Sequence, residues 1–257
     1  MKVVILAGGL GTRMDSETAT KPKPMVMIGK KPILWHIMKI FSFYNIRDFV
    51  ICTGYKKEVL EEFFKNDFLS SNCLLIEKQS IEFNVKINAN EEWHVTLEDT
   101  GLDTMTGGRL KKIKHHLTET FCLTYGDTLN NLNISDLISF HNLNKKLATV
   151  TACQPPGKFG ILKIDDGIVT KFTEKPKGDD QWVNGGFFIL EPSVIDYVED
   201  DSTVWENKPL QRLVNEEQLS AFKHFGFYQP MDTIQEKNIL ENMWNLDCLL
   251  YTSDAAD

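Results

Sequence analysis

The chain has 257 residues, of which 42% are hydrophobic and 25% are charged, and its formal net charge is −8 at pH 7. This length allows one or two domains with a sizeable core. The acidic balance argues against a nucleic-acid-binding protein, whose binding surface is basic. No window approaches the roughly 18 uninterrupted apolar residues of a membrane span, and the N-terminus lacks a signal-peptide pattern. We therefore expect a cytoplasmic protein that contacts no membrane.

The five cysteines are scattered along the chain, and no two of them form a C-x-x-C pair. Several lie inside apolar runs, such as Cys52 in "FVICTG" and Cys122 in "FCLTYGD". This usage predicts reduced thiols in the core, with neither a disulfide framework nor a zinc site.

Strand and helix patterns alternate through the first half of the chain. In chain order we predict a strand at 3–8, a helix at 32–44, a strand at 48–54, a helix at 56–67, a strand at 120–127 and a helix at 135–143. Ser135 is a preferred residue type for the N-cap of the last helix. This alternation indicates a mostly parallel sheet that is covered on both faces.

The second half is richer in strands. It predicts strands at 147–153, 160–165, 168–174 and 185–190, and then an amphipathic helix at 204–218. We find no internal repeat and no low-complexity linker. The pattern indicates one compact α/β unit with an added small sheet.

The segment "LAGGLGTRM" follows the first predicted strand, and its glycines allow backbone N–H groups to approach an anion. It does not match the P-loop, because no Lys-Ser/Thr pair follows the last glycine. It also fails the G-x-G-x-x-G dinucleotide pattern, because Met14 stands at the last position. A plain tight turn therefore competes with a phosphate-binding loop. Arg13 favours the second reading, and so does Lys23, which two prolines flank in "KPKPM".

With these two segments, the chain resembles the sugar-1-phosphate nucleotidyltransferases, whose signature is L-A-G-G-x-G-T-R followed by P-K-P-M. Further motifs of that family follow in the expected order: "TGLDTMTGGRL", "YGD", "EKP", "NGGFFIL" and "FYQPMDT". The resemblance spans roughly Met1 to Trp244, and the "TMTGGR" and "QPMDT" versions are similar to the branch that uses CTP. It implies a Rossmann-like three-layer α/β/α fold with a mostly parallel central sheet and a small β-rich sugar-binding part.

The implied reaction converts CTP and α-D-glucose 1-phosphate to CDP-glucose and pyrophosphate, by in-line attack of the sugar phosphate on the α-phosphorus. Such a reaction requires two polyanions to be neutralised and aligned. The resemblance further implies a role in dideoxyhexose synthesis for surface polysaccharide and a homo-oligomer, in particular a hexamer. We expect a single domain over residues 1–244, with a nucleotide-binding part at about 1–130 and a sugar-phosphate-binding part at about 131–232.

The resemblance also assigns site residues. Arg13, Lys23 and Asp127 are the implied catalytic residues, and Asp127 and Asp232 are the implied Mg²⁺ ligands. The nucleotide is assigned to Leu6, Ala7, Gly8, Gly9, Leu10, Gly11, Thr12, Arg13, Lys23, Thr104, Gly107, Gly108, Arg109 and Gly126. The sugar phosphate is assigned to Glu174, Lys175, Asn184, Gly185 and Gly186. Carboxylates that lie outside the motifs, such as Asp136, receive no role.

Two histidine motifs lie outside this assignment. We expect His36, within an apolar helix, to be packed in the core. We expect His115 and His116 to be solvated and not to bind a metal.

The chain departs from the family pattern at Lys30 and Thr128, where glycine is commoner, and in its last stretch. The segment 245–257 lacks the basic, aromatic tail of the family, and we interpret it as foreign or truncated. Two alternatives stay open: a uridylyl- or thymidylyltransferase on the same scaffold, and a catalytically silent relative that only binds nucleotide sugars. The presence of Arg13, Lys23, Asp127 and Asp232 together argues against the silent relative.

Overall fold

The structure is a computed structural model that describes residues 1–9, 11, 14–66, 70–76, 79–155, 157, 160–175 and 177–246. Three of the predicted nucleotide-binding residues, Leu10, Thr12 and Arg13, lie outside the described residues, as does the segment from 247 to 257.

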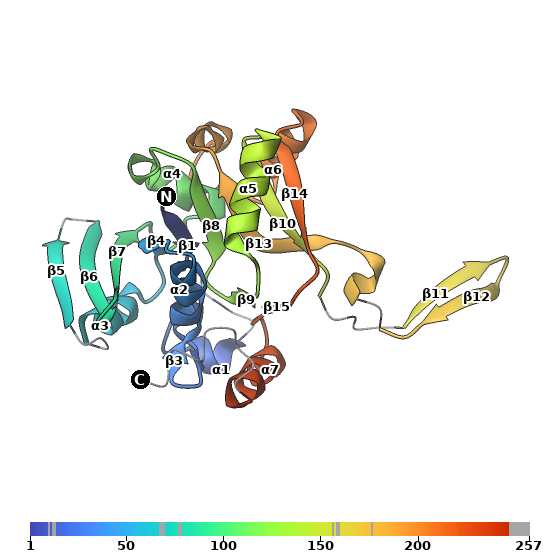
Figure 1. Ribbon diagram of the computed structural model, residues 1–257, viewed down its shortest axis with the longest axis horizontal. Coiled ribbons are helices and arrows are strands. Elements are labelled where there is room, and N and C mark those ends of the chain that lie inside the picture. The colour runs from blue at the N-terminus through green and yellow to red at the C-terminus, as the bar shows by residue number, and fades with distance from the viewer. Residues whose placement is uncertain are drawn as a thin grey trace.

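Within the described residues, a nine-stranded sheet forms the centre of the molecule (Figure 1), in the order β14-β10-β13-β8-β1-β4-β7-β6-β5. Its strands are β1 (Val3–Leu6), β4 (Asp48–Thr53), β5 (Ser70–Ile76), β6 (Ser80–Asn88), β7 (Glu91–Asp99), β8 (Phe121–Tyr125), β10 (Ala148–Cys153), β13 (Val183–Leu190) and β14 (Leu219–His224). The four strands β8-β1-β4-β7 run parallel to one another. β13 on one side and β6 on the other are antiparallel to this centre, and β14 at the edge pairs parallel with β10.

Helices and short elements surround the sheet. The helices are α1 (Asp15–Thr18), α2 (Ile33–Phe43), α3 (Lys57–Asn66), α4 (Thr106–Lys112), α5 (Ile134–Asn144), α6 (Lys208–Asn215) and α7 (Ile234–Asn245). The 3₁₀ turns in the described residues are η2 (Lys23–Met25), η3 (Lys114–His116), η4 (Lys177–Asp180) and η5 (Pro192–Tyr197). Three two-stranded sheets complete the description: β2 (Met27–Ile28) with β3 (Lys31–Pro32), β9 (Thr128–Asn130) with β15 (Tyr228–Pro230), and β11 (Ile161–Asp165) with β12 (Ile168–Thr173).

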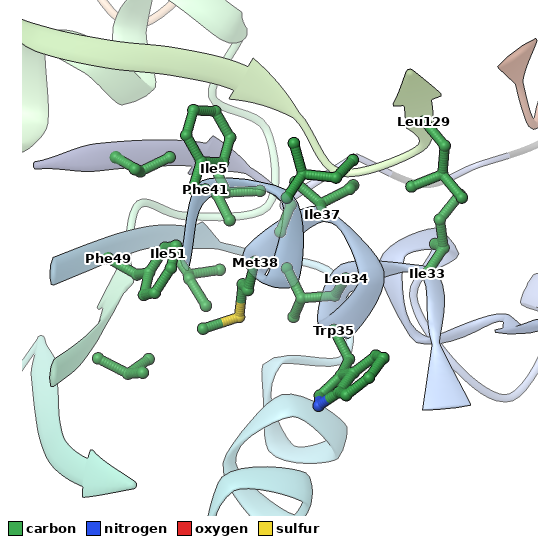
Figure 2. Packing of buried hydrophobic residues seen from close by; sticks show 14 of the residues in the cluster. Ile5, Ile33, Leu34, Trp35, Ile37, Met38, Phe41, Phe49, Ile51 and Leu129 are labelled. Carbon is green, nitrogen blue, oxygen red and sulfur yellow. The ribbon is translucent and has the colours of Figure 1, made fainter. Parts of the chain in front are cut away.

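Alternate residues of the central strands face two separate hydrophobic clusters, because successive side chains of a strand point to opposite faces. Ile5 and Phe49 belong to the cluster that contains α2, α3, α5 and α7 residues. Val4 and Val50 belong to the cluster that contains residues of α4, η5 and α6. Figure 2 shows side chains of α2 lying against those of β1 and β4. The predicted three-layer α/β/α fold with a parallel centre is therefore confirmed.

Most of the predicted elements are present, with two corrections. The helix predicted from Ser135 begins at Ile134, and its cap is Asn133, whose side chain accepts a hydrogen bond from the backbone N–H of Asp136. The helix predicted at 204–218 is limited to Lys208–Asn215, because Pro209 stands in its first turn, where its missing N–H is tolerated. The strands β5, β6 and β7 were not predicted from sequence.

The hairpin β11–β12 projects away from the sheet (Figure 1). Several of its apolar side chains are exposed, including those of Ile164, Ile168 and Phe172. Every helix in the described part of the chain is too short or too polar to cross a bilayer.

The described cysteine side chains agree with the prediction, since Cys52, Cys122 and Cys153 are free and buried. Burial raises the pKa of each of these thiols to about 12, so they are protonated at neutral pH. They act as core residues.

Candidate active site

A pocket of about 260 Å³ opens at the carboxyl ends of β1 and β8. Its described lining consists of Leu6, Ala7, Gly9, Gly11, Lys23, Pro24, Gly126, Asp127 and Asp232. Ligands of α/β sheets bind at this edge. The structure thus brings together residues from three of the predicted motifs, "LAGGLGTRM", "KPKPM" and "YGD", with the aspartate of "QPMDT".

The glycine loop continues from β1 with little space for side chains on one side. A Cβ at Gly8 would lie 2.0 Å from the guanidinium of Arg109, whereas a Cβ at Gly9 would meet no atom of the described residues within 4 Å. Gly11 has φ +65°, which disfavours other residue types. Its carbonyl oxygen accepts hydrogen bonds from the Met14 N–H and the Thr18 hydroxyl, each at 3.1 Å. The glycines therefore allow both close packing beneath the loop and an open surface toward the pocket.

Lys23 begins the 3₁₀ turn η2, and Pro22 and Pro24 hold the backbone on either side of it. Its Nζ lies 2.6 Å from Asp127 Oδ2 and 2.6 Å from Asp232 Oδ1. Burial lowers the pKa of Lys23, but the charges and hydrogen bonds of the two carboxylates outweigh this effect and raise it overall. Lys23 is therefore a fixed cation between two anions.

The two aspartates are 105 positions apart in the sequence, and backbone pairing brings them together. Asp127 directly precedes β9, whose Thr128 pairs with Pro230 of β15. The Met231 N–H donates to the Asp127 carbonyl oxygen at 2.9 Å. The Asp232 N–H donates to Glu236 Oε2 at 2.7 Å, and Glu236 belongs to the capping box of α7. Both carboxylates are thus set by ordered backbone.

These carboxylates fit a divalent metal such as Mg²⁺, which prefers one or two carboxylates together with phosphate oxygens and water. Two of their oxygens lie within 2.6 Å of one nitrogen, so they are close enough to share a single ion. The lysine occupies the position between them and supplies the positive charge that the pair requires. The donor set, oxygen only and partly exposed, suits a hard cation.

Arg109 is buried on α4 and its guanidinium points at backbone oxygens. Nη1 donates to the carbonyl oxygens of Thr53 and Gly101 and to the Thr100 hydroxyl, at 2.6–3.0 Å. Nη2 donates to the Gly8 carbonyl oxygen at 3.0 Å. Burial lowers the pKa of Arg109, but this hydrogen-bonded guanidinium stays charged at neutral pH. Arg109 therefore ties the end of β4 and the turn after β7 to the glycine loop.

The neighbouring glycines of "TMTGGR" also serve packing. A Cβ at Gly107 would lie 2.8 Å from the Thr203 carbonyl oxygen, and one at Gly108 would lie 2.5 Å from that of Asp201. Thr104 is buried, and its hydroxyl accepts a hydrogen bond from Lys112 Nζ at 3.0 Å. The described lining of the pocket contains none of Thr104, Gly107, Gly108 and Arg109.

The predicted sugar-phosphate residues lie in two places. Glu174 and Lys175 follow β12 at the base of the projecting hairpin, are exposed, and face each other at 3.7 Å. Asn184, Gly185 and Gly186 lie at the start of β13, beside the "YGD" segment. A Cβ at Gly186, which has φ +76°, would lie 2.7 Å from the Tyr125 ring. Neither set belongs to the described lining of the pocket.

The sequence analysis gave no role to Glu206, which lies beside Tyr125 and Thr106. The Glu206 carboxylate accepts hydrogen bonds from the hydroxyls of Tyr125 and Thr106, the second at 2.7 Å. It thereby joins "YGD" to "TMTGGR". Its nearest sequence neighbours contain no recognised motif, so only the folded contacts reveal it.

His36 lies in the core as predicted, whereas His116 differs from its prediction. His36 is buried and packs against Trp35 and Trp244, as predicted. His116 was expected to be solvated, but its Nε2 lies 3.3 Å from the buried carboxylate of Glu98. His115 is the exposed third member of this cluster, whose potential ligand atoms lie within 4.8 Å of one another. The contact between His116 and Glu98 explains why the potential ligand atoms of this cluster lie close together, without a metal ion.

Comparison with known proteins places these features among relatives. The model of the family described as Nucleotidyl transferase matches residues 2–233. The chain is 52% identical over 246 residues to the glucose-1-phosphate cytidylyltransferase of Salmonella typhi, covering 95% of this chain and 96% of that protein. It is 43% identical over 249 residues to the probable glucose-1-phosphate cytidylyltransferase of Bacillus subtilis, covering 95% and 96%. A UTP-bound UGPase from Acinetobacter baumannii has a TM-score of 0.71 at 15% identity, covering 96% and 93%, and supports the fold alone.

Proposed function

The chain belongs to the nucleotidyl transferase family, and from this premise we propose that it transfers a cytidylyl group from CTP to glucose 1-phosphate. A phosphate oxygen of the sugar phosphate attacks the α-phosphorus of CTP, and the bond from that phosphorus to the bridging oxygen of pyrophosphate breaks. The observation that carries the proposal is the meeting of Lys23, Asp127 and Asp232 in a pocket lined by the glycine loop. The 52% identity to the glucose-1-phosphate cytidylyltransferase of Salmonella typhi supports the choice of these two substrates.

The residues of this chain contribute charge and orientation. Gly9 and Gly11 line the pocket, and there the glycine loop receives the phosphates of the nucleotide on backbone N–H groups. Lys23 is held inside the same pocket, where it neutralises phosphate charge near the reacting phosphorus. Asp127 and Asp232 would hold the metal ion, which when bound neutralises phosphate oxygens and supports the departure of pyrophosphate. Arg13 is assigned to the departing pyrophosphate by resemblance.

From the family resemblance we further propose that the metal is Mg²⁺, that the protein acts in the cytoplasm as a homo-oligomer, and that its product serves dideoxyhexose synthesis. Thr104 and the turn at Gly107, Gly108 and Arg109 serve the nucleotide; for Arg109 this role is positional, since it fixes the glycine loop. The segment after residue 130 serves the sugar phosphate, through Glu174, Lys175 and the start of β13.

The test is pyrophosphate release from glucose 1-phosphate and Mg²⁺ with CTP, UTP, dTTP or ATP in turn. We expect release with CTP, and its loss in Asp232→Asn. Asp136→Asn, an exposed carboxylate on α5, is the matched control and should retain the wild-type rate. Release with UTP or dTTP in place of CTP would favour the uridylyl- or thymidylyltransferase alternative. Nucleotide binding without release by the folded protein would favour the silent relative.

A further inference from the structure

Glu206 lies in the segment before α6, directly after the buried Trp205. Both of its carboxylate oxygens are used: Oε1 accepts from the Tyr125 hydroxyl, and Oε2 accepts from the Thr106 hydroxyl at 2.7 Å. Thr106 Oγ1 in turn accepts a hydrogen bond from the Trp205 N–H at 2.9 Å. The carboxylate is therefore held at both ends by donors from two different motifs.

Tyr125 passes this order on to the start of β13. Asn184 Nδ2 donates to the Tyr125 hydroxyl oxygen at 3.4 Å, and Asn184 Oδ1 accepts from the Gly186 N–H at 2.9 Å. The Tyr125 ring also packs directly on Gly186, where a Cβ would lie 2.7 Å from the ring. The Asn184 amide is thus oriented at both of its polar atoms.

The direction of these hydrogen bonds follows from the groups that meet. A phenol is protonated at neutral pH, and the Tyr125 hydroxyl lies within hydrogen-bond distance of one Glu206 carboxylate oxygen and of the Asn184 amide nitrogen. An ionised carboxylate can only accept, so the phenol donates to Glu206 and its oxygen remains free to accept from Asn184. Glu206 therefore determines which way the Tyr125 hydroxyl points.

We propose that Glu206 is a positioning residue for the sugar 1-phosphate, acting through Tyr125 on Asn184 and Gly186. This inference rests on the proposed function, in which the start of β13 receives the sugar. The contact with Thr106 also fixes the carboxylate to the N-terminal end of α4, the helix that carries Arg109. Glu206 thus connects the sugar side of the site to the helix that holds the glycine loop.

The test compares steady-state constants of the full-length protein and its variants for both substrates. We expect Glu206→Ala to raise the KM for glucose 1-phosphate by about tenfold, the usual effect of losing one charge-assisted hydrogen bond, with a smaller change in the KM for CTP. Tyr125→Phe should have a similar effect, and the double variant Tyr125→Phe/Glu206→Ala should be no worse than the single variants. Such non-additivity is expected when two residues act through one contact.

Glu206→Gln provides the rescue. Its amide oxygen can accept from Tyr125 while its NH₂ donates to Thr106, so the KM for glucose 1-phosphate should stay near the wild-type value. Glu199→Gln is the matched control, because Glu199 is an exposed carboxylate of the same segment and pairs with Lys208 at 3.3 Å. This control should match the wild type in all constants.

Four results would overturn the inference. They are an equal rise of both KM values, additive effects in the double variant, a Glu206→Gln variant as impaired as Glu206→Ala, and a Glu206→Ala variant that is unaffected while the wild type is active. The last of these would leave the proposed function intact. If wild type and Glu199→Gln both fail with CTP and glucose 1-phosphate, the proposed function itself is wrong. Thermal unfolding of each variant checks that it is folded.

Discussion

Gly8 and Gly9 are neighbouring glycines of the same loop, but the space around their Cβ positions differs sharply. A methyl group added at Gly8 would overlap the buried Arg109 guanidinium, which makes four hydrogen bonds of 3.0 Å or less to neighbouring oxygens. The same addition at Gly9 meets no atom of the described part of the chain within 4 Å.

We predict that Gly8→Ala lowers the free energy of unfolding by about 1–3 kcal/mol, because the guanidinium must leave a position where each lost bond exposes a buried polar group. Gly9→Ala should change the free energy of unfolding by less than about 0.5 kcal/mol. Urea denaturation of the two variants measures the difference. Equal stability of both variants would contradict the packing seen beneath Gly8.

Lys23 pairs with two carboxylates in the structure, and the proposed function gives it a second role in the reaction. Without it, two carboxylates would lie close together with no cation between them. We predict that Lys23→Met lowers the rate of pyrophosphate release by about 10²–10³-fold. In the absence of metal it should also lower the melting temperature, and added Mg²⁺ should restore more of it in the variant than in the wild type.

Differential scanning fluorimetry with EDTA or Mg²⁺ measures this effect. Lys21→Met is the control in the same loop, since Lys21 pairs only loosely with Glu17 at 3.5 Å. If Lys23→Met melted at the wild-type temperature without metal and gained nothing from Mg²⁺, the two carboxylates would not be competing for a cation.

At the scale of elements, helix ends illustrate how local geometry selects one of two equally suitable cap residues. Asn133 and Ser135 are both good N-cap residues, but Asn133 has extended backbone dihedrals and its side chain reaches the Asp136 N–H at 3.2 Å. Ser135 is an exposed residue within the first turn.

Replacement of each candidate cap by alanine tests the assignment. Asn133→Ala should lower the free energy of unfolding by about 1 kcal/mol, because one backbone donor loses its partner. Ser135→Ala should be neutral or slightly stabilising, because alanine is the better helix former. Chemical denaturation of the two variants decides between the caps, and the reverse order of stabilities would mean that the helix begins at Ser135.

The elements of the site depend on one another through few contacts. The pairing of β9 with β15 and the capping box of α7 hold the two aspartates together, and Arg109 holds the glycine loop to the ends of β4 and β7. The arrangement of the pocket residues therefore depends on contacts between distant elements and not on the glycine loop alone.

At the scale of the whole molecule, His36 joins three parts of the fold. Its Nε2 donates to the Ile28 carbonyl oxygen at 2.9 Å, and its ring contacts Trp244 of α7. Burial lowers the pKa of His36 to about 4. In the unfolded chain the imidazole takes up a proton near pH 6.5, so the unfolded state binds more protons between these two values.

We predict that this residue contributes stability that is complete above pH 6.5 and is lost as the pH falls toward 4, by up to about 3 kcal/mol. His36→Gln keeps a donor for Ile28 but does not titrate, so its free energy of unfolding should fall less than that of the wild type between pH 7 and 4. His94→Gln, at a half-exposed position of β7, is the control. Parallel pH curves for wild type and His36→Gln would contradict the prediction.

Much of the fold follows from patterns within short segments. The apolar runs of β1, β4 and β8 and the periodicity of α2 and α3 are local signals, and the structure confirms these elements. The strands β5 to β7 were missed, and the hairpin β11–β12 gave no sign that it projects from the body, because neither property depends on local composition alone.

The chemical groups of the candidate site can be read from the sequence: a glycine loop after a buried strand, a lysine between two prolines, and aspartates in two ordered motifs. The fold was needed to show that Lys23 lies between those two aspartates, that Arg109 binds backbone oxygens, and that Glu206 contacts both Tyr125 and Thr106. A motif specifies side chains within a few residues, whereas a contact between residues about 100 positions apart exists only once the sheet has placed their strands side by side.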